Sequence, residues 1–228
     1  MNRIESLIET IIDEYHADKR LSGTILISKD RSVIFEKAYG EASIQLGVPN
    51  RLDTKFHIAS VTKMFIAAAA LKLHGEGRIN LHHHPGAGQD NPRLINKNRA
   101  CGHTVVDGEY RNAENDKLAD LAHVPGELYS TVKDLRIWCD ALLNHEILPE
   151  DLSAKLFTPY ASVDFDPGLM YGYGWFLGGD RRIVGGGTPG FRSEIFQSPE
   201  QKINVIMLWN NETVNSHELY WRIHGRLR

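Results

Sequence analysis

Two side chains that could carry out covalent chemistry, Ser60 and Lys63, stand three residues apart. Residues at this spacing on a helix share a face and can touch. The apolar run at 64–71 follows, and because it is apolar on every side it predicts a buried helix. The N-terminus of such a helix places unpaired N–H groups and a partial positive charge beside the hydroxyl. The pattern is typical of a serine nucleophile whose proton is taken by a lysine.

Spacing alone is a weak signal, because a chain of this length contains on the order of one Ser-x-x-Lys match by chance. A second match, Ser130 to Lys133, occurs at the start of a predicted amphipathic helix over 130–144. There the serine is interpreted as a helix N-cap. Ser60 has the same alternative interpretation, as a cap beside a lysine whose stem packs on apolar surface.

A glycine-rich stretch, Val184-Gly-Gly-Gly-Thr-Pro-Gly-Phe191, is the second candidate for chemistry. Glycines at a strand end allow a ligand or another backbone to come close. A free strand N–H there could act with the N–H of Ser60 as an oxyanion hole. The alternative is an ordinary glycine-rich hairpin.

The elements that must position these residues follow a simple order. An amphipathic helix over 3–17 precedes a hairpin of strands 22–28 and 32–38, and four further strands are predicted at 171–177, 181–185, 191–197 and 203–209. A helix over 218–227 closes the chain. The order predicts an α+β fold, with an antiparallel sheet of about five to six strands flanked by N- and C-terminal helices.

Composition excludes several classes of function. With 228 residues, 42% apolar and 24% charged, the chain has the composition of a soluble globular protein. Its net charge of -3 and lack of a basic block argue against nucleic-acid binding. We expect a cytoplasmic protein without a membrane segment, because the N-terminus lacks a signal-peptide pattern and no apolar run reaches about 20 residues. We expect no cofactor and no metal, since His82-His-His84 lacks the fixed spacing of a metal motif.

The motifs together resemble those of the serine β-lactamase and penicillin-binding-protein-like hydrolases, in the branch of class C β-lactamases, D-alanyl-D-alanine carboxypeptidases and esterases. The resemblance is carried by Phe56-His-Ile-Ala-Ser-Val-Thr-Lys63, residues 75–81, residues 128–138, Tyr171-Gly-Tyr-Gly-Trp175 and Gly186-Gly-Thr-Pro-Gly-Phe191. It implies one β-lactamase-like domain over 1–228, with a sheet lobe from 1–55 and 168–228 and a reduced helical region over 56–167.

The resemblance also implies site residues. Ser60 would form an acyl-enzyme with a small ester, β-lactam or D-amino-acid peptide, and Lys63 would take or relay its proton. Gly186 and Gly187 would bind the substrate, with the N–H groups of Ser60 and Gly187 holding the oxyanion. Such enzymes share a three-motif set.

Two positions depart from the family pattern. Val184 stands where the third motif usually opens with a basic or polar residue, and a valine donates no hydrogen bond. Tyr110-Arg-Asn112 matches the letters of the middle motif, but a polar segment follows it and we interpret it as a chance match. A catalytically impaired relic or binding protein is therefore the alternative. A reduced helical region would also uncover apolar surface, which predicts a homo-oligomer.

Overall fold

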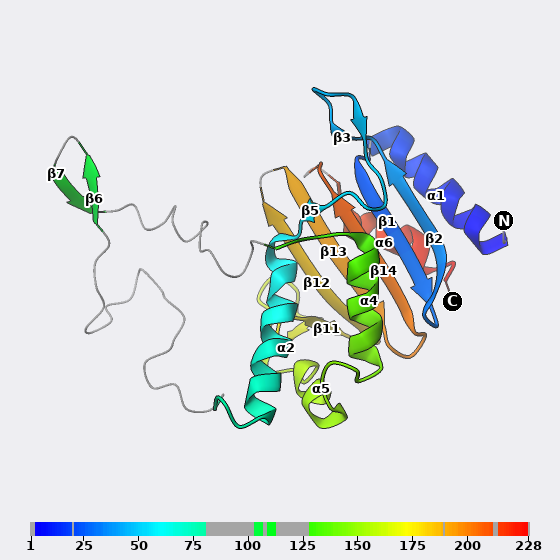
Figure 1. Cartoon of the computed structure of the whole chain (residues 1–228). Coiled ribbons are helices and arrows are strands. Elements are labelled where there is room, and N and C mark those ends of the chain that lie inside the picture. The colour runs from blue at the N-terminus through cyan, green and yellow to red at the C-terminus, as the bar shows by residue number, and fades with distance from the viewer. Residues whose placement is uncertain are drawn as a thin grey trace.

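The computed structural model describes residues 3–19, 21–80, 103–106, 109–112, 128–188, 190–211 and 214–227. Its main element is an antiparallel sheet of eight strands: β1 (Gly23–Lys29), β2 (Ser32–Tyr39), β9 (Ala161–Ser162), β10 (Met170–Tyr171), β11 (Phe176–Gly178), β12 (Arg181–Thr188), β13 (Phe191–Ser198) and β14 (Ile203–Trp209). Their order across the sheet is β2-β1-β14-β13-β12-β11-β10-β9 (Figure 1). The predicted α+β class is confirmed.

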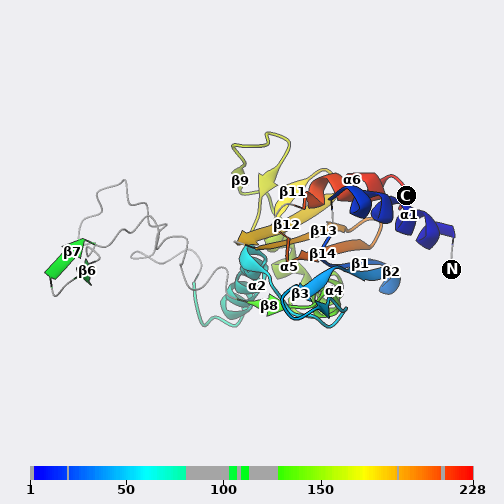
Figure 2. The ribbon, with the colours of Figure 1, turned by 90° about the horizontal axis from the view of Figure 1, so that it is seen from above.

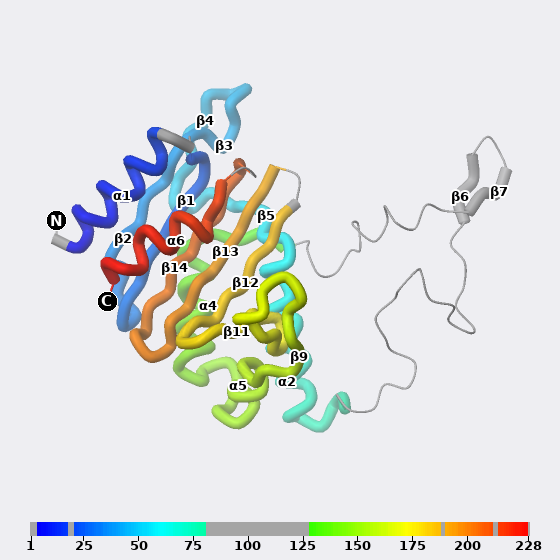
Figure 3. Tube along the Cα trace, turned by 180° about the vertical axis from the view of Figure 1, so that it is seen from behind, coloured from blue at the N-terminus to red at the C-terminus, as the bar shows by residue number. Residues whose placement is uncertain are grey.

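Helices cover both faces of this sheet. On one face lie α1 (Arg3–Lys19) and α6 (Ser216–His224), which Figure 3 shows in front of the strands. On the other face lie α2 (Thr62–Gly75), α4 (Val132–Leu143) and α5 (Glu150–Leu156), and the view from above separates the layers (Figure 2). No described helix is both long enough and apolar enough to cross a bilayer.

The central strands divide their side chains between two cores. In β1, Ile25 and Ile27 pack with α1 and α6, whereas Leu26 between them packs with α2 and α4. In β14, Met207 and Leu208 alternate in the same way. Because successive side chains of a strand point to opposite faces, a strand covered on both sides is apolar throughout. This explains the unbroken apolar run from Val205 to Trp209 in β14.

Three small antiparallel pairs complete the described structure. They are β3 (Glu41–Ser43) with β4 (Val48–Pro49), β5 (Phe56–His57) with β8 (Tyr129–Ser130), and β6 (His103–Val106) with β7 (Glu109–Asn112). The β5–β8 pair helps to position the candidate site, because β5 leads into the turn that carries Ser60.

The structure corrects the expected number of strands. The sheet has eight strands rather than five to six. The segment expected to be one strand at 171–177 is split into β10 and β11, because the chain turns between Gly172 and Trp175, where Gly172 N–H bonds to the Trp175 carbonyl at 2.9 Å. β9 adds a further short edge strand in the region expected to be helical.

The cap of α4 is also one residue from its predicted position. Ser130 belongs to β8, and the hydroxyl oxygen of Thr131 accepts the N–H of Asp134 at 3.1 Å. Ser130 pairs with Phe56 across β5–β8 and is extended, so the next hydroxyl residue takes the cap.

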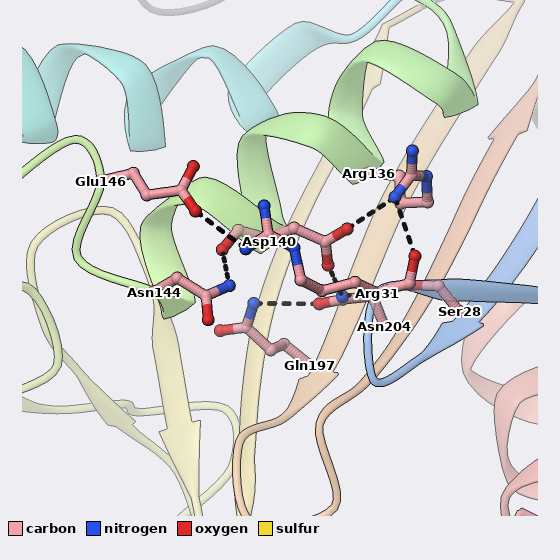
Figure 4. Close-up of polar contacts among 8 residues, drawn as sticks. All are labelled: Ser28, Arg31, Arg136, Asp140, Asn144, Glu146, Gln197 and Asn204. Atoms are coloured by element: carbon pink, nitrogen blue, oxygen red, sulfur yellow. Dashed lines mark hydrogen bonds and ion pairs between the residues drawn. The ribbon is translucent and has the colours of Figure 1, made fainter.

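A buried polar network fastens α4 to the sheet (Figure 4). Asp140 of α4 accepts Arg136 at 2.7 Å and Asn204 of β14 at 3.1 Å. Asn204 in turn donates to Ser28 of β1 and accepts from Gln197 of β13. Because an unmade hydrogen bond is costly in the interior, this network fixes how α4 lies across three strands.

Candidate active site

The segment before Ser60 is held from two sides. Ile58 donates its N–H to the Leu128 carbonyl at 2.9 Å, which continues the β5–β8 pairing. On the other side the Ser193 hydroxyl of β13 donates to the His57 carbonyl at 3.2 Å. Residues from three distant parts of the chain therefore fix the approach to Ser60.

A sharp turn then presents Ser60. Ala59 has a φ of 47°, in the left-handed region that side chains with a Cβ adopt at a cost of about 1–2 kcal/mol. Ser60 follows in a single 3-10 turn, η1 (Ala59–Val61), that runs directly into α2. Strained residues of this kind persist where the surrounding structure holds them, and they cluster at functional sites.

Ser60 and Lys63 meet. Lys63 Nζ lies 2.6 Å from Ser60 Oγ, a short hydrogen-bond distance. Burial lowers the pKa of Lys63 below its ordinary value of 10.5, since desolvation disfavours the ammonium form. The pair thus has the geometry for proton transfer and a lysine that loses its own proton more readily.

The second Ser-x-x-Lys match has a different geometry. The Ser130 hydroxyl contacts the carbonyl of the adjacent Thr131 at 3.5 Å, while Lys133 Nζ points to Glu36 at 3.8 Å. The interpretation of Ser130 as structural agrees with these contacts, although it is not the cap itself.

The glycine-rich strand β12 passes directly behind Ser60. A Cβ at Gly186 would lie 2.5 Å from the Ser60 nitrogen and 2.7 Å from the Ile58 carbonyl oxygen, so any larger residue would displace the turn. Gly187 faces the opposite side of the sheet, where a Cβ would lie 3.4 Å from Arg192 Nη1. The close approach predicted for the glycines is thus made by Gly186, with Gly187 the next residue along the strand.

Gly174 has a similar role on the other side of the pair. Its φ is 80°, and a Cβ there would lie 3.1 Å from the Lys63 carbonyl oxygen. The 171–175 segment can therefore pack against the first turn of α2, and Trp175 behind it is fully buried. This segment is one of those that carry the family resemblance, and the contact gives a physical reason for its glycine.

A cavity of about 470 Å³ opens beside the pair. Its described lining residues are Ser60, Lys63, Ser162, Val163, Asp164, Phe165, Tyr171, Gly174, Phe176, Val184 and Gly185. Gly186 and Gly187 are not among these lining residues. The charged groups of this lining are Lys63 and Asp164, and the rest of the wall is largely apolar or aromatic.

Sequence reasoning missed the segment 162–165. The sequence around Asp164 and Pro167 is typical of a turn, and nothing in this local pattern indicates that the turn borders the cavity. Val184, by contrast, lies where the resemblance suggested: it is 3% exposed and forms part of the wall. Arg181 and Arg182 do not take the place of the basic or polar residue that the family usually has at position 184. Their guanidinium groups lie over the rings of Trp221 and Phe157, respectively.

Two other candidate motifs lie outside the described side chains or segments. The backbone of Tyr110 lies in β7, opposite Val105 of β6, and its side chain is outside the description. His82-His-His84 falls outside the described residues altogether. In the part of the chain that the structure describes, no three His, Cys, Asp or Glu side chains gather as a metal site would require.

Comparison with known proteins supports the resemblance. The esterase EstB of Burkholderia gladioli is 32% identical over 75 residues, which is 32% of this chain and 19% of the esterase. The chain thus aligns with about a fifth of this curated relative's length.

Two solved structures share the fold over almost the whole chain. A penicillin-binding protein from Bacillus halodurans has a TM-score of 0.67 at 18% identity, with 99% of each chain covered. An octameric penicillin-binding protein homologue from Pyrococcus abyssi has a TM-score of 0.71 at 18% identity, covering 96% of this chain and 75% of that one. The model of the family described as Beta-lactamase matches residues 8–84 and 91–227. The chain therefore belongs to the beta-lactamase family.

Proposed function

We propose that the protein is a serine hydrolase in which Ser60 forms an acyl-enzyme with an ester, a β-lactam or a D-amino-acid amide. The observation that carries the proposal is the 2.6 Å contact between Lys63 Nζ and Ser60 Oγ at the wall of a cavity. Family membership supports hydrolase chemistry of this kind.

Acylation would begin when neutral Lys63 accepts the Ser60 proton. The Ser60 oxygen attacks the substrate carbonyl carbon, and the tetrahedral intermediate collapses as the alcohol or amine leaves with a proton from Lys63. Water then attacks the acyl-enzyme, and the products are a carboxylic acid and free Ser60. Burial of Lys63 supports this role, because only the neutral amine can take a proton.

We infer that the N–H groups of Ser60 and Gly187 hold the developing oxyanion. Support comes from the approach of β12 at Gly186, which brings this strand against the Ser60 nitrogen. β11 pairs with β12 only as far as Ile183, so among the described strands the later part of β12 has an unpaired edge beside the cavity. N–H groups on such an edge are available to a substrate oxygen.

A second candidate is a catalytically impaired binding protein of the same fold. The observation in its favour is Val184, a buried apolar residue in the cavity wall where a hydrogen-bond donor would help to orient a substrate. Hydrolysis of nitrocefin or p-nitrophenyl acetate that disappears in Ser60→Ala would contradict this candidate.

Covalent labelling tests the main proposal directly. We expect a fluorophosphonate probe to add to Ser60 in the wild type, with mass analysis placing the adduct on the peptide that contains it. Ser130→Ala is the matched control, because it removes the hydroxyl of the other Ser-x-x-Lys match and should label normally. A folded wild type with no adduct on Ser60 would overturn the proposal.

A further inference from the structure

An apolar groove adjoins the catalytic cavity. It has a volume of about 310 Å³ and is lined by Lys63, Ile66, Ala67, Ala70, Leu71 and residues 171–174. Three of these residues, Lys63, Tyr171 and Gly174, also line the cavity that contains Ser60. The two hollows thus share a wall, and a molecule at Ser60 can extend past Lys63 into the groove.

Residues on one side of α2 make the groove apolar. Lys63 is the charged residue of the groove lining, and it lies at the end that meets the catalytic cavity. Ala67 and Ala70 are small and leave room between the helix and the 171–174 segment, while Leu71 is buried and Ile66 is 40% exposed. Among the described residues, Leu71 and Ala67 pack into or against the protein's core, whereas Ile66 leaves apolar surface of α2 uncovered.

We propose that this groove binds the unbranched apolar chain of an ester substrate whose carbonyl is attacked by Ser60. The inference rests on the proposed hydrolase function and narrows its substrate class. From Lys63 to Ala70 the helix rises by about 10 Å, the length of an extended chain of about eight carbons. The chain is held by burial of apolar surface, which is non-directional and increases with each methylene group.

The reaction itself is ordinary ester hydrolysis. The Ser60 oxygen bonds to the carbonyl carbon, the bond from that carbon to the alkoxy oxygen breaks, and the alcohol leaves with the proton that Lys63 received. Water then cleaves the acyl-enzyme and returns a proton to Ser60. The chain in the groove belongs either to the acyl group or to the alcohol, and two series of esters distinguish these cases.

The charges of the catalytic cavity favour such a substrate over an anionic one. A β-lactam or a peptide with a free carboxylate needs a cation to receive it. In the described lining the cation is Lys63, which must be neutral to act as a base, and Asp164 would repel a carboxylate. Val184 offers no donor either. An uncharged ester meets none of these costs.

The first experiment needs only the wild type. Below the concentration at which the substrates form micelles, kcat/KM is measured for p-nitrophenyl acetate, butyrate, hexanoate and octanoate, and for acetate esters of the matching alcohols. One series should rise by up to about fourfold per added methylene, since burying each CH₂ stabilises by about 0.8 kcal/mol. Profiles that are flat or falling in both series would overturn the inference.

Neighbouring alanines on α2 offer a matched pair of variants. Ala70 lines the groove, whereas Ala69 is exposed and is not among the lining residues. In Ala70→Phe the added ring fills the groove, and the ratio of kcat/KM for octanoate to that for acetate should fall at least tenfold. Ala69→Phe should keep the wild-type ratio, and both variants are checked for folding by circular dichroism. Equal ratios in the two variants would contradict the placement of the chain.

Binding separates this inference from the proposed function. Ser60→Ala is titrated with ethyl octanoate and with ethyl acetate, with and without Ala70→Phe. Tighter binding of the octanoate that Ala70→Phe abolishes supports the groove even if the wild type shows no turnover. Turnover that depends on Ser60 but not on the chain length of the ester would support the hydrolase function and contradict chain binding in the groove.

Discussion

At the scale of single residues, the difference between two identical motifs lies in what the hydroxyl and the amine can reach. Ser60 and Lys63 touch each other, whereas Lys133 reaches Glu36. Two features account for the difference: the turn at Ala59 and the passage of Gly186 behind the Ser60 nitrogen. Both fix the position of Ser60 just before α2. Sequence spacing contains neither fact.

Lys63→Arg tests the role of the amine. The guanidinium stays charged at all accessible pH values, so it cannot take the Ser60 proton, and kcat/KM should fall by about 10²–10⁴-fold.

In the wild type, kcat/KM should rise with pH as Lys63 loses its proton, with a midpoint below 10.5 because burial lowers the pKa of Lys63. The measurement is a pH–rate profile of ester hydrolysis. Persistence of the same ascending limb in Lys63→Arg would assign it to another group.

At the scale of elements, the placement of α4 depends on a few buried polar atoms. Asp140→Ala would remove one of the two acceptors of the Asn204 amide and the carboxylate partner of Arg136, and should lower the free energy of unfolding by about 2–4 kcal/mol. The matched control is Glu146→Ala, which removes a largely exposed ion pair with Arg31 and should cost less than about 1 kcal/mol. Urea denaturation measures both, and similar losses in the two variants would contradict the importance of the network.

Strand β13 contributes a pH dependence of stability through Glu194. This carboxyl is 7% exposed, and burial raises its pKa to about 7, although Ser216 and Arg192 act in the opposite direction. Between its unfolded pKa near 4.5 and about 7, the folded state holds more protons than the unfolded state, so the contribution of Glu194 to stability declines as pH rises. Its full range is at most about 3 kcal/mol.

Glu194→Gln should remove this decline. Thermal melts of wild type and variant between pH 5 and pH 8 should converge at the acid end, with the variant more stable at the alkaline end. His217, whose Nε2 lies 3.9 Å from Glu194, is controlled with His217→Gln, which keeps the carboxyl in place. A wild-type slope unchanged by Glu194→Gln would show that another group controls it.

At the scale of the whole molecule, apolar side chains stand exposed on the outer side of α2 and α4. Ile66 is 40% exposed and Ile137 is 58% exposed. Figure 1 shows the two helices side by side. The sequence predicted a buried α2, and this was wrong for its outer side, because an all-apolar pattern does not reveal whether a neighbour covers every face.

We expect the α4 part of this surface, around Ile137, to support self-association. Sedimentation velocity at micromolar concentration should show species above the 25.7 kDa monomer, and Ile137→Glu should shift the distribution towards monomer. Lys155→Glu, on the short helix α5, is a control for the added acidic residue. A single monomer peak for the wild type would refute the expectation.

Much of the fold was predictable because the relevant patterns are local. The apolar stripe of α1, the β1–β2 hairpin and the apolar run of β14 can each be recognised from a short stretch of sequence. Other features depend on partners far along the chain. The break between β10 and β11 lies at glycines within a segment that otherwise has the pattern of one strand, so the sequence does not reveal it. The position of Asp164 in the cavity wall follows only from tertiary packing.

The pairing of β1 with β14 has a consequence for synthesis on the ribosome. β1 pairs along its whole length with β14, and the His57 carbonyl is held by Ser193 of β13. A nascent chain that has exposed Ser60 and Lys63 outside the exit tunnel still lacks both strands. The proposed nucleophile can therefore be aligned only after β13 and β14 have emerged from the ribosome. Until then, an apolar α2 and an open strand edge are vulnerable to aggregation and to chaperone capture.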